Sequence, residues 1–111
     1  MTVINIPELL SNQPLITQMK LVSNKDYSCH VLKSHIGDSV PIHHHKEWNE
    51  TWYIIDGEFK VWIEGSSEFI AKSGDLIHIE KKKKHRIETK SESATRLAIF
   101  KDGVEIIYNE D

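Results

Sequence analysis

The stretch GDSVPIHHHKEWNETWYIIDG, residues 37–57, decides the fold of this chain of 111 residues. Two glycines, Gly37 and Gly57, bound it, and nothing between them supports a helix of three turns. Residues 51–55 have the composition of a β-strand, and the Asp56-Gly57 pair that follows is a turn signal. The stretch therefore predicts extended chain interrupted by turns.

The same reading extends to both sides of this stretch. Short runs with a period near two recur at close spacing, and each is closed by Gly, Asp, Ser or Asn. Many short strands in one small domain predict an all-β fold, an antiparallel sandwich or barrel in which closure removes exposed edges. Besides 51–55, the expected strands are 27–33, 59–63, 68–71, 76–79, 85–89, 96–100 and 104–108.

The N-terminal residues have a different pattern. Pro7 and Pro14 flank Glu-Leu-Leu-Ser, and because proline breaks a longer helix, this segment allows a short helical turn at most. The strand pattern starts at Met19. We therefore predict a short N-terminal arm over residues 1–18 and a β-barrel domain over residues 19–111.

Composition excludes several classes of partner and places the chain in a compartment. A formal charge of -3 and a pI near 6.1 argue against nucleic acid and anionic membrane as partners. No apolar run approaches the roughly 18 residues of a membrane span, and the start lacks the basic n-region of a signal peptide. The single Cys29 excludes an intrachain disulfide framework. We predict a cytoplasmic protein.

A homodimer is also expected. A chain of this size only partly seals an apolar core, so burying one face against a second copy would stabilise it. Tyr53, Ile55 and Trp62 are predicted to face outward, and residues 1–6 add further apolar area.

Histidine is the unusual residue of this sequence, with seven copies, three of them consecutive. On an extended chain His43 and His45 point to the same face and can reach one ion, while Glu50 can return from the short turn after them as a hard ligand. His85 joins them only if the sheet closes. The alternative is that the three consecutive histidines are solvated loop residues.

The spacing of these residues resembles the cupin superfamily of small β-barrels. The first cupin motif, Gly-x5-His-x-His-x3-4-Glu-x6-Gly, is met at Gly37, His43, His45, Glu50 and Gly57. The second motif matches only at Gly74, Asp75 and His85, because Glu80, Lys82 and Lys84 stand where the family has Pro, Gly and Pro, and Glu88 stands near a usual Asn. The resemblance implies a double-stranded β-helix, or jelly-roll, barrel. It also implies one divalent ion per chain, Mn, Fe, Co, Ni, Cu or Zn, held by His43, His45, Glu50 and His85.

Other residues are expected around this site. Trp52 shares the inward face of Glu50 and is either a pocket wall or plain core, while Leu97 and Ile99 are expected to complete the barrel wall. His78, or less readily His30 or His35, is a candidate for proton transfer, although each alone is more often structural. By alternation His44 points away from the ligands.

The run Lys81 to Lys84 has two interpretations: a ring of positive charge at the barrel mouth that attracts an anionic substrate, or a solvated turn balanced by Glu80 and Glu88.

Three functions are compatible with the expected metal site. The first is a metal-dependent enzyme that acts on a small, oxygen-rich metabolite, sugar-like or carboxylate, by Lewis-acid isomerisation or elimination or by dioxygenation. The second is a non-catalytic module that binds or senses a small molecule through the metal, and the third is a metal-stabilised dimerisation domain.

Overall fold

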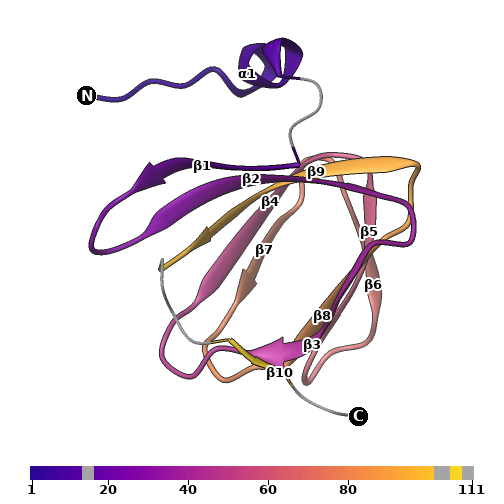
Figure 1. The fold of residues 1–111 in the computed structure, drawn as a ribbon. Helices are drawn as coiled ribbons and strands as arrows, with labels where there is room; N and C mark the ends of the chain where they lie inside the picture. Colours follow the sequence, from indigo (N-terminus) through magenta and orange to yellow (C-terminus); the bar gives the residue numbers. More distant parts are fainter. Residues whose placement is uncertain (14–16, 102–105, 109–111) are drawn as a thin grey trace.

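The computed structural model describes residues 1–13, 17–101 and 106–108, and its strands form two antiparallel sheets that face each other (Figure 1). The first sheet has the order β1 (Gln18–Ser23), β2 (Ser28–His35), β9 (Ser93–Phe100), β4 (Glu50–Asp56), β7 (Leu76–Ile79). The second has the order β10 (Ile107–Tyr108), β3 (Ser39–His44), β8 (His85–Thr89), β5 (Glu58–Ile63), β6 (Phe69–Lys72). The all-β antiparallel class is confirmed.

The expected strands agree with these elements to within a few residues. Those at 76–79 and 85–89 have the observed bounds, whereas β9 begins three residues before the expected 96–100. Of the expected strand 104–108, residues 104 and 105 lie outside the described residues. The sequence pattern does not delimit β3, whose pairing with β8 is irregular between Val40 and His43. Pro41 lies at this irregularity, where a missing backbone donor costs no ladder hydrogen bond.

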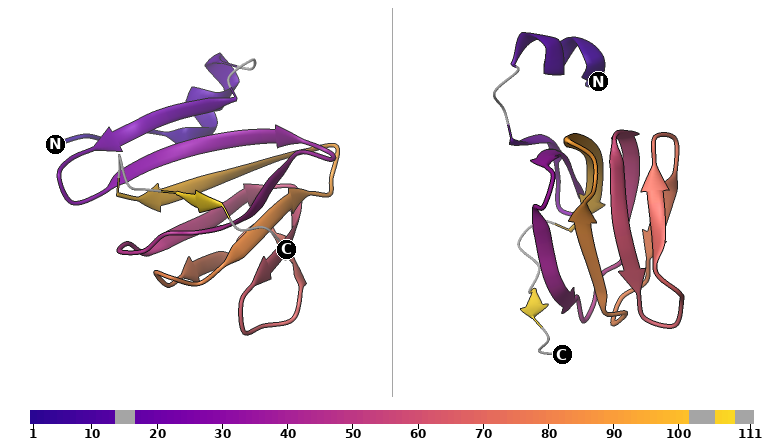
Figure 2. Two further views of the ribbon diagram at one scale, coloured as in Figure 1. Left: turned by 60° about the horizontal axis from the view of Figure 1, so that its bottom comes forward. Right: turned by 90° about the vertical axis from the view of Figure 1, so that its right-hand side faces the viewer.

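The N-terminal segment contains helix α1, Ile6–Asn12. The Asn5 side chain accepts a hydrogen bond from the backbone N–H of Glu8 (3.0 Å) and caps the helix. Its seven residues make about two turns, so the expectation of a short turn at most is wrong. Pro7 lies in the first turn, where the missing N–H needs no partner. No residue of α1 is buried, Ile6, Leu9 and Leu10 are half-buried, and the helix lies beyond β1 (Figures 1 and 2).

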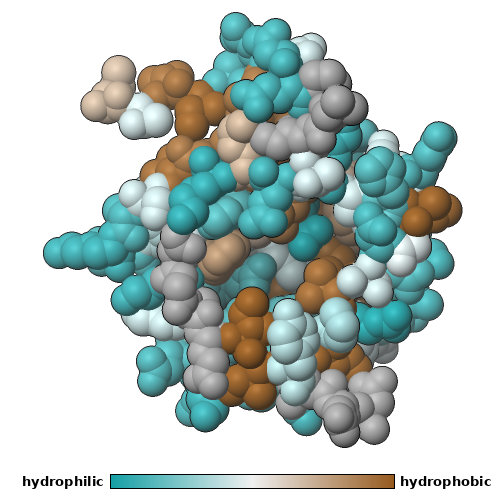
Figure 3. Space-filling view, viewed as in Figure 1, coloured by the Kyte–Doolittle hydropathy of each residue, from teal (hydrophilic) through white to brown (hydrophobic). Residues whose placement is uncertain are grey.

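The core lies between the two sheets. Alternate residues of each strand point inward, and the largest buried side chains are those of Trp52, Phe59 and Ile54. A cavity of about 540 Å³ adjoins this core, because Trp52 and Ile87 belong to both. In the space-filling view the surface is hollowed near its centre, between the two sheets (Figure 3). Among the described residues no helix is long and apolar enough to cross a membrane.

Candidate metal centre

The two sheets bring the four predicted ligands together. His43 lies near the end of β3, His45 follows that strand, and Glu50 opens β4 after a four-residue turn. His85 opens β8 and is the backbone partner of His43 across the β3–β8 pair. One ligand atom from each side chain lies within 4.8 Å of the others, and all four residues are buried.

Backbone hydrogen bonds orient two of the imidazoles. The Nδ1–H of His43 donates to the Pro41 carbonyl (2.9 Å), and the Nδ1–H of His85 donates to the Lys83 carbonyl (2.9 Å). In each ring Nε2 is then the nitrogen that carries the lone pair. The Nε2 atom of His85 is buried and has no hydrogen-bond partner within the described residues. An unpartnered, inward-facing nitrogen is the arrangement that a metal ion satisfies.

Glu50 supplies the carboxylate of the cluster. Its Oε1 lies 3.1 Å from His45 Nε2 and 3.9 Å from His85 Nε2, and Trp52 Nε1 donates to its Oε2 (2.5 Å). Burial disfavours the ionised form, but the hydrogen bonds of His45 and Trp52 and the charges of nearby imidazoles outweigh burial and leave the pKa of Glu50 below its ordinary value. The ligand oxygen is therefore ionised at neutral pH.

Burial favours the neutral form of two of the candidate histidine ligands, His43 and His85. Burial lowers the pKa of His85 to about 4, and burial also lowers the pKa of His43. Neutral imidazole is the form that binds a metal, so no proton has to leave these rings at neutral pH. Three neutral nitrogens and one carboxylate oxygen fit Mn, Fe, Co, Ni, Cu or Zn, and five- or six-coordinate geometry would leave one or two positions open.

The cluster opens onto the cavity, which supplies apolar walls and a few polar groups. Trp52 lines it and also belongs to the core, so both interpretations of this residue hold. A volume of about 540 Å³ suits a small metabolite. Further lining side chains are His30, Leu32, Ser34, Val40, Ile87, Thr89, Arg96 and Phe100.

Three of the side chains predicted near the site lie elsewhere. Leu97 and Ile99 are not among the described cavity-lining residues, because β9 turns Arg96 and Ala98 inward and the alternating residues Leu97 and Ile99 outward. His78 is exposed, and its Nδ1 lies 2.9 Å from the Thr51 hydroxyl on the outer face of the first sheet.

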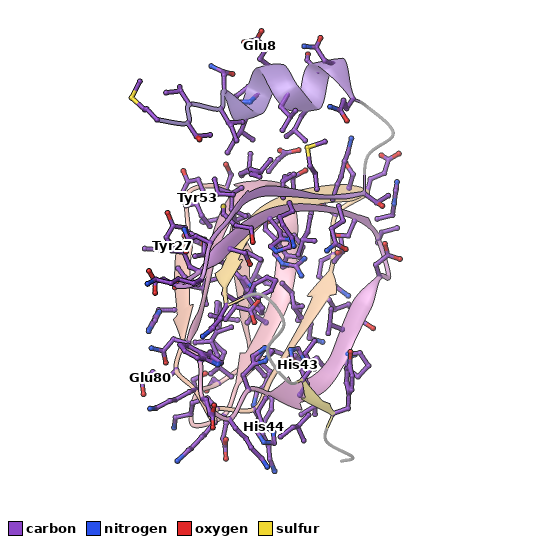
Figure 4. The ribbon with its side chains drawn as sticks, turned by 60° about the vertical axis from the view of Figure 1, so that its left-hand side comes forward. Glu8, Tyr27, His43, His44, Tyr53 and Glu80 are labelled. Carbon is purple, nitrogen blue, oxygen red and sulfur yellow. The ribbon has the colours of Figure 1, made fainter. Side chains whose placement is uncertain are left out.

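The other histidines lie in different positions relative to the cavity. His44 points away from the barrel while His43 lies inside it, as alternation predicts (Figure 4). His35 is exposed, with its Nδ1 4.0 Å from Asp38. His30 is buried and lines the cavity, stacked on Phe100 with ring centroids 4.7 Å apart.

The lysine run does not surround this cavity. Lys81, Lys82 and Lys84 line a separate surface hollow that also contains Glu47 and Glu64. The interpretation as a charged mouth is therefore wrong for the described structure. The buried cation of the cavity is instead Arg96, which the sequence analysis missed. Its only signal was an arginine at an inward position, between Ala94 and Ala98.

Two facing antiparallel sheets around three histidines and a glutamate define a β-barrel with an internal cluster that could hold a metal ion. The sequence model of the cupin domain matches residues 31–100. The chain therefore belongs to the cupin family. No curated protein matches it.

Solved structures of low sequence identity share the fold. KdgF from Halomonas sp. is 18% identical with a TM-score of 0.71, over 75% of this chain and 76% of that one. The polyketide cyclase RemF from Streptomyces resistomycificus is 16% identical with a TM-score of 0.75, over 85% and 70%. The DMSP lyase DddQ from Ruegeria pomeroyi DSS-3 is 17% identical with a TM-score of 0.73, over 83% of this chain but 50% of that one.

Proposed function

We propose that His43, His45, Glu50 and His85 hold one divalent transition-metal ion, and that the chain is a metal-dependent enzyme acting on a small, oxygen-rich metabolite. One observation carries this proposal: four donor atoms converge within 4.8 Å beside a cavity, and one of them, His85 Nε2, is buried without a partner. A purely structural site has no need of an adjoining cavity.

A bound ion of this kind supplies Lewis-acid polarisation of substrate oxygens and, if it is redox-active, dioxygen chemistry. The residues of the chain would do the rest. Trp52, Leu32 and Phe100 form walls that exclude water, and a substrate with two adjacent oxygens would place the carbon between them beside these walls. His30, whose Nε2 lies 3.1 Å from the Ser28 hydroxyl, is the cavity-lining imidazole outside the ligand set and the candidate to move a proton.

Relatives by fold support an enzyme over a binding module. The DMSP lyase DddQ and the polyketide cyclase RemF are enzymes built on this barrel. These structures support an enzyme as the class of protein. Because they are less than 20% identical to this chain, the reaction stays open between isomerisation, elimination and dioxygenation.

The alternative is a non-catalytic module that binds or senses a small molecule through the metal. The observation in its favour is that His30 already contacts Ser28 and stacks on Phe100, and so has a structural explanation. Both functions require the same metal and the same ligand binding, and turnover of the bound molecule separates them.

Elemental analysis of untagged protein in metal-poor buffer tests the metal site. We expect close to one transition-metal ion per chain in the wild type and loss of that ion in both His43→Ala and His85→Ala, with His44→Ala as the matched control that retains it. A wild type without metal that takes up none on titration would refute the proposal.

We also propose a homodimer formed through the outer face of the first sheet. Leu97, Tyr53 and Leu76 are register partners across β9, β4 and β7, and they make one apolar row on that face. Trp62 lies on β5 in the second sheet, so it does not belong to the patch with Tyr53. Tyr53→Asp should therefore elute as a monomer from a sizing column and Trp62→Asp as a dimer. A monomeric wild type would rule the dimer out.

A further inference from the structure

The cavity contains a buried cation that the metal site does not use. Arg96 is only 8% exposed and lines the cavity from the inner face of β9. Its Nε atom is buried without a hydrogen-bond partner, and within the described residues no carboxylate lies within 4.0 Å of its guanidinium. A buried charge without a partner is costly, so such a group needs an explanation.

Aromatic rings account for part of the environment of Arg96. Its guanidinium carbon lies 5.3 Å from the ring centroid of Trp52 and 5.4 Å from that of Phe59. Ring faces stabilise the cation, but they accept few of its five N–H donors. Burial lowers the pKa of Arg96 to about 10, while Glu50 acts in the opposite direction, so the group stays protonated at neutral pH. The donors therefore remain available to a ligand in the cavity.

The charge balance of the cavity indicates which kind of ligand binds there. Glu50 is the carboxylate of the metal cluster, so in the loaded site its negative charge is shared with a divalent ion. The metal, Arg96 and Lys33 together then exceed Glu50 and Asp38, the two carboxylates among the lining residues, so the cavity has excess positive charge. An oxyanion removes that excess, and guanidinium matches the geometry of carboxylate and phosphate with two parallel hydrogen bonds.

The other cations of the chain are placed differently. Arg86, the other of the two arginines, lies on β8 with Nη2 3.5 Å from Glu88 Oε1, and its side chain is 42% exposed. Lys33 lines the cavity but is half-buried. The lysine run lines the separate hollow described above.

We propose that Arg96 is the anion-binding residue of the cavity, where it holds the carboxylate or phosphate group of a small ligand beside the metal cluster. This inference rests on the proposed metal function and narrows its substrate to an oxyanion. Trp52 would keep the guanidinium in position by stacking, while its indole N–H holds Glu50. One tryptophan thus connects the metal ligand and the anion site.

Calorimetry on the zinc-loaded protein tests the proposal with malonate, inorganic phosphate and the neutral analogue malonamide. We expect malonate or phosphate to bind and malonamide to bind at least tenfold more weakly. Arg96→Met should weaken the anion about tenfold or more and retain zinc, whereas Arg86→Met and Lys33→Gln should change the affinity less than threefold. The better of the two anions distinguishes a carboxylate from a phosphate ligand.

Nuclear magnetic resonance keeps the test independent of how well Arg96→Met folds. With two arginines in the chain, Arg86→Lys leaves a single Nε–H resonance, that of Arg96. We expect anion titration into this zinc-loaded variant to shift that resonance saturably, and malonamide to leave it in place.

The outcomes separate this inference from the metal function. Zinc uptake with an unmoved Arg96 resonance, or with equal anion affinity in wild type and Arg96→Met, overturns the anion site alone. A protein that takes up none of Mn, Fe, Co, Ni, Cu and Zn on titration but shows a saturable Arg96 shift upholds the anion site and overturns the metal function. If anion affinity is lost in Lys33→Gln and kept in Arg96→Met, the anion binds at Lys33 and the proposal is refuted.

Discussion

The two segments that carry the four proposed metal ligands reach the same site in different ways. Segment 43–50 contributes three ligands through strand alternation and one short turn. Segment 79–85 contributes one, His85, after a turn in which Lys82 has a positive φ of 71°. Lys82 is the only non-glycine residue with a positive φ among those described, and it stands where the family motif has Gly.

Hydrogen bonds join the two segments. The backbone N–H of Lys82 donates to the His45 carbonyl (2.6 Å), and that of Lys81 donates to Asn49 Oδ1 (2.9 Å). Regular strand geometry therefore defines the site on one side. On the other side, contacts to the first segment hold an unfavourable turn in place.

The largest expected effect is a loss of metal affinity in Glu50→Gln, a substitution in the first segment. This change keeps the shape of the side chain but removes the charge that faces the imidazoles, so we expect metal affinity to fall by about a hundredfold or more. Competition with a fluorescent chelator measures it. Glu47→Gln, an exposed acidic residue of the same turn, is the matched control. Equal affinities in the two variants would show that Glu50 is not a ligand.

The two motif glycines that bound the first segment provide a second comparison. Gly57 has φ of 81°, and a Cβ there would lie 2.5 Å from the Ser93 carbonyl oxygen. Gly37 has φ of 89° but nothing within 4 Å of its Cβ position. Gly57→Ala adds a steric clash to the backbone cost, so it should lower the free energy of unfolding by about 3 kcal/mol, against about 1 kcal/mol for Gly37→Ala. Urea denaturation measures both, and equal losses would mean that β9 yields easily to the added methyl group.

A third prediction concerns pH and the second segment. The pKa of His85 is about 4 in the folded protein and 6.5 by its ordinary value, so the unfolded chain binds more protons between these values. Stability of the metal-free protein should therefore rise with pH across this window, and His85 should account for about 2 kcal/mol between pH 5 and pH 7.

Chemical denaturation of metal-free protein at the two pH values checks this contribution. His85→Gln should have a smaller pH dependence than the wild type. His78→Gln, which alters an exposed histidine, should keep the full dependence. A His85→Gln curve that parallels the wild type would show that His85 is protonated equally in both states.

How far the sequence predicts this molecule also differs between its parts. The spacing of His43, His45 and Glu50 is a property of extended chain, so sequence alone indicates a shared face. Arg96 could not be found in this way, because an inward arginine and an outward Leu97 reverse the usual pattern on β9. The reversal depends on Trp52 and Phe59, which lie far away in sequence and provide the ring faces for the guanidinium.

The smallest expected effect sharpens the comparison at the turn itself. Lys82→Gly removes the cost of a left-handed backbone for a residue with a Cβ, and the entropy of glycine offsets part of that gain, so we expect a net stabilisation of about 0.5 to 1 kcal/mol. Lys83→Gly, which has no positive φ to relieve, should destabilise by about 0.5 to 1 kcal/mol. Urea midpoints of the metal-free variants measure both changes. A loss of stability in Lys82→Gly would mean that the lysine side chain stabilises this turn by more than the backbone conformation costs, and segment 79–85 would then be as well defined by its own residues as segment 43–50.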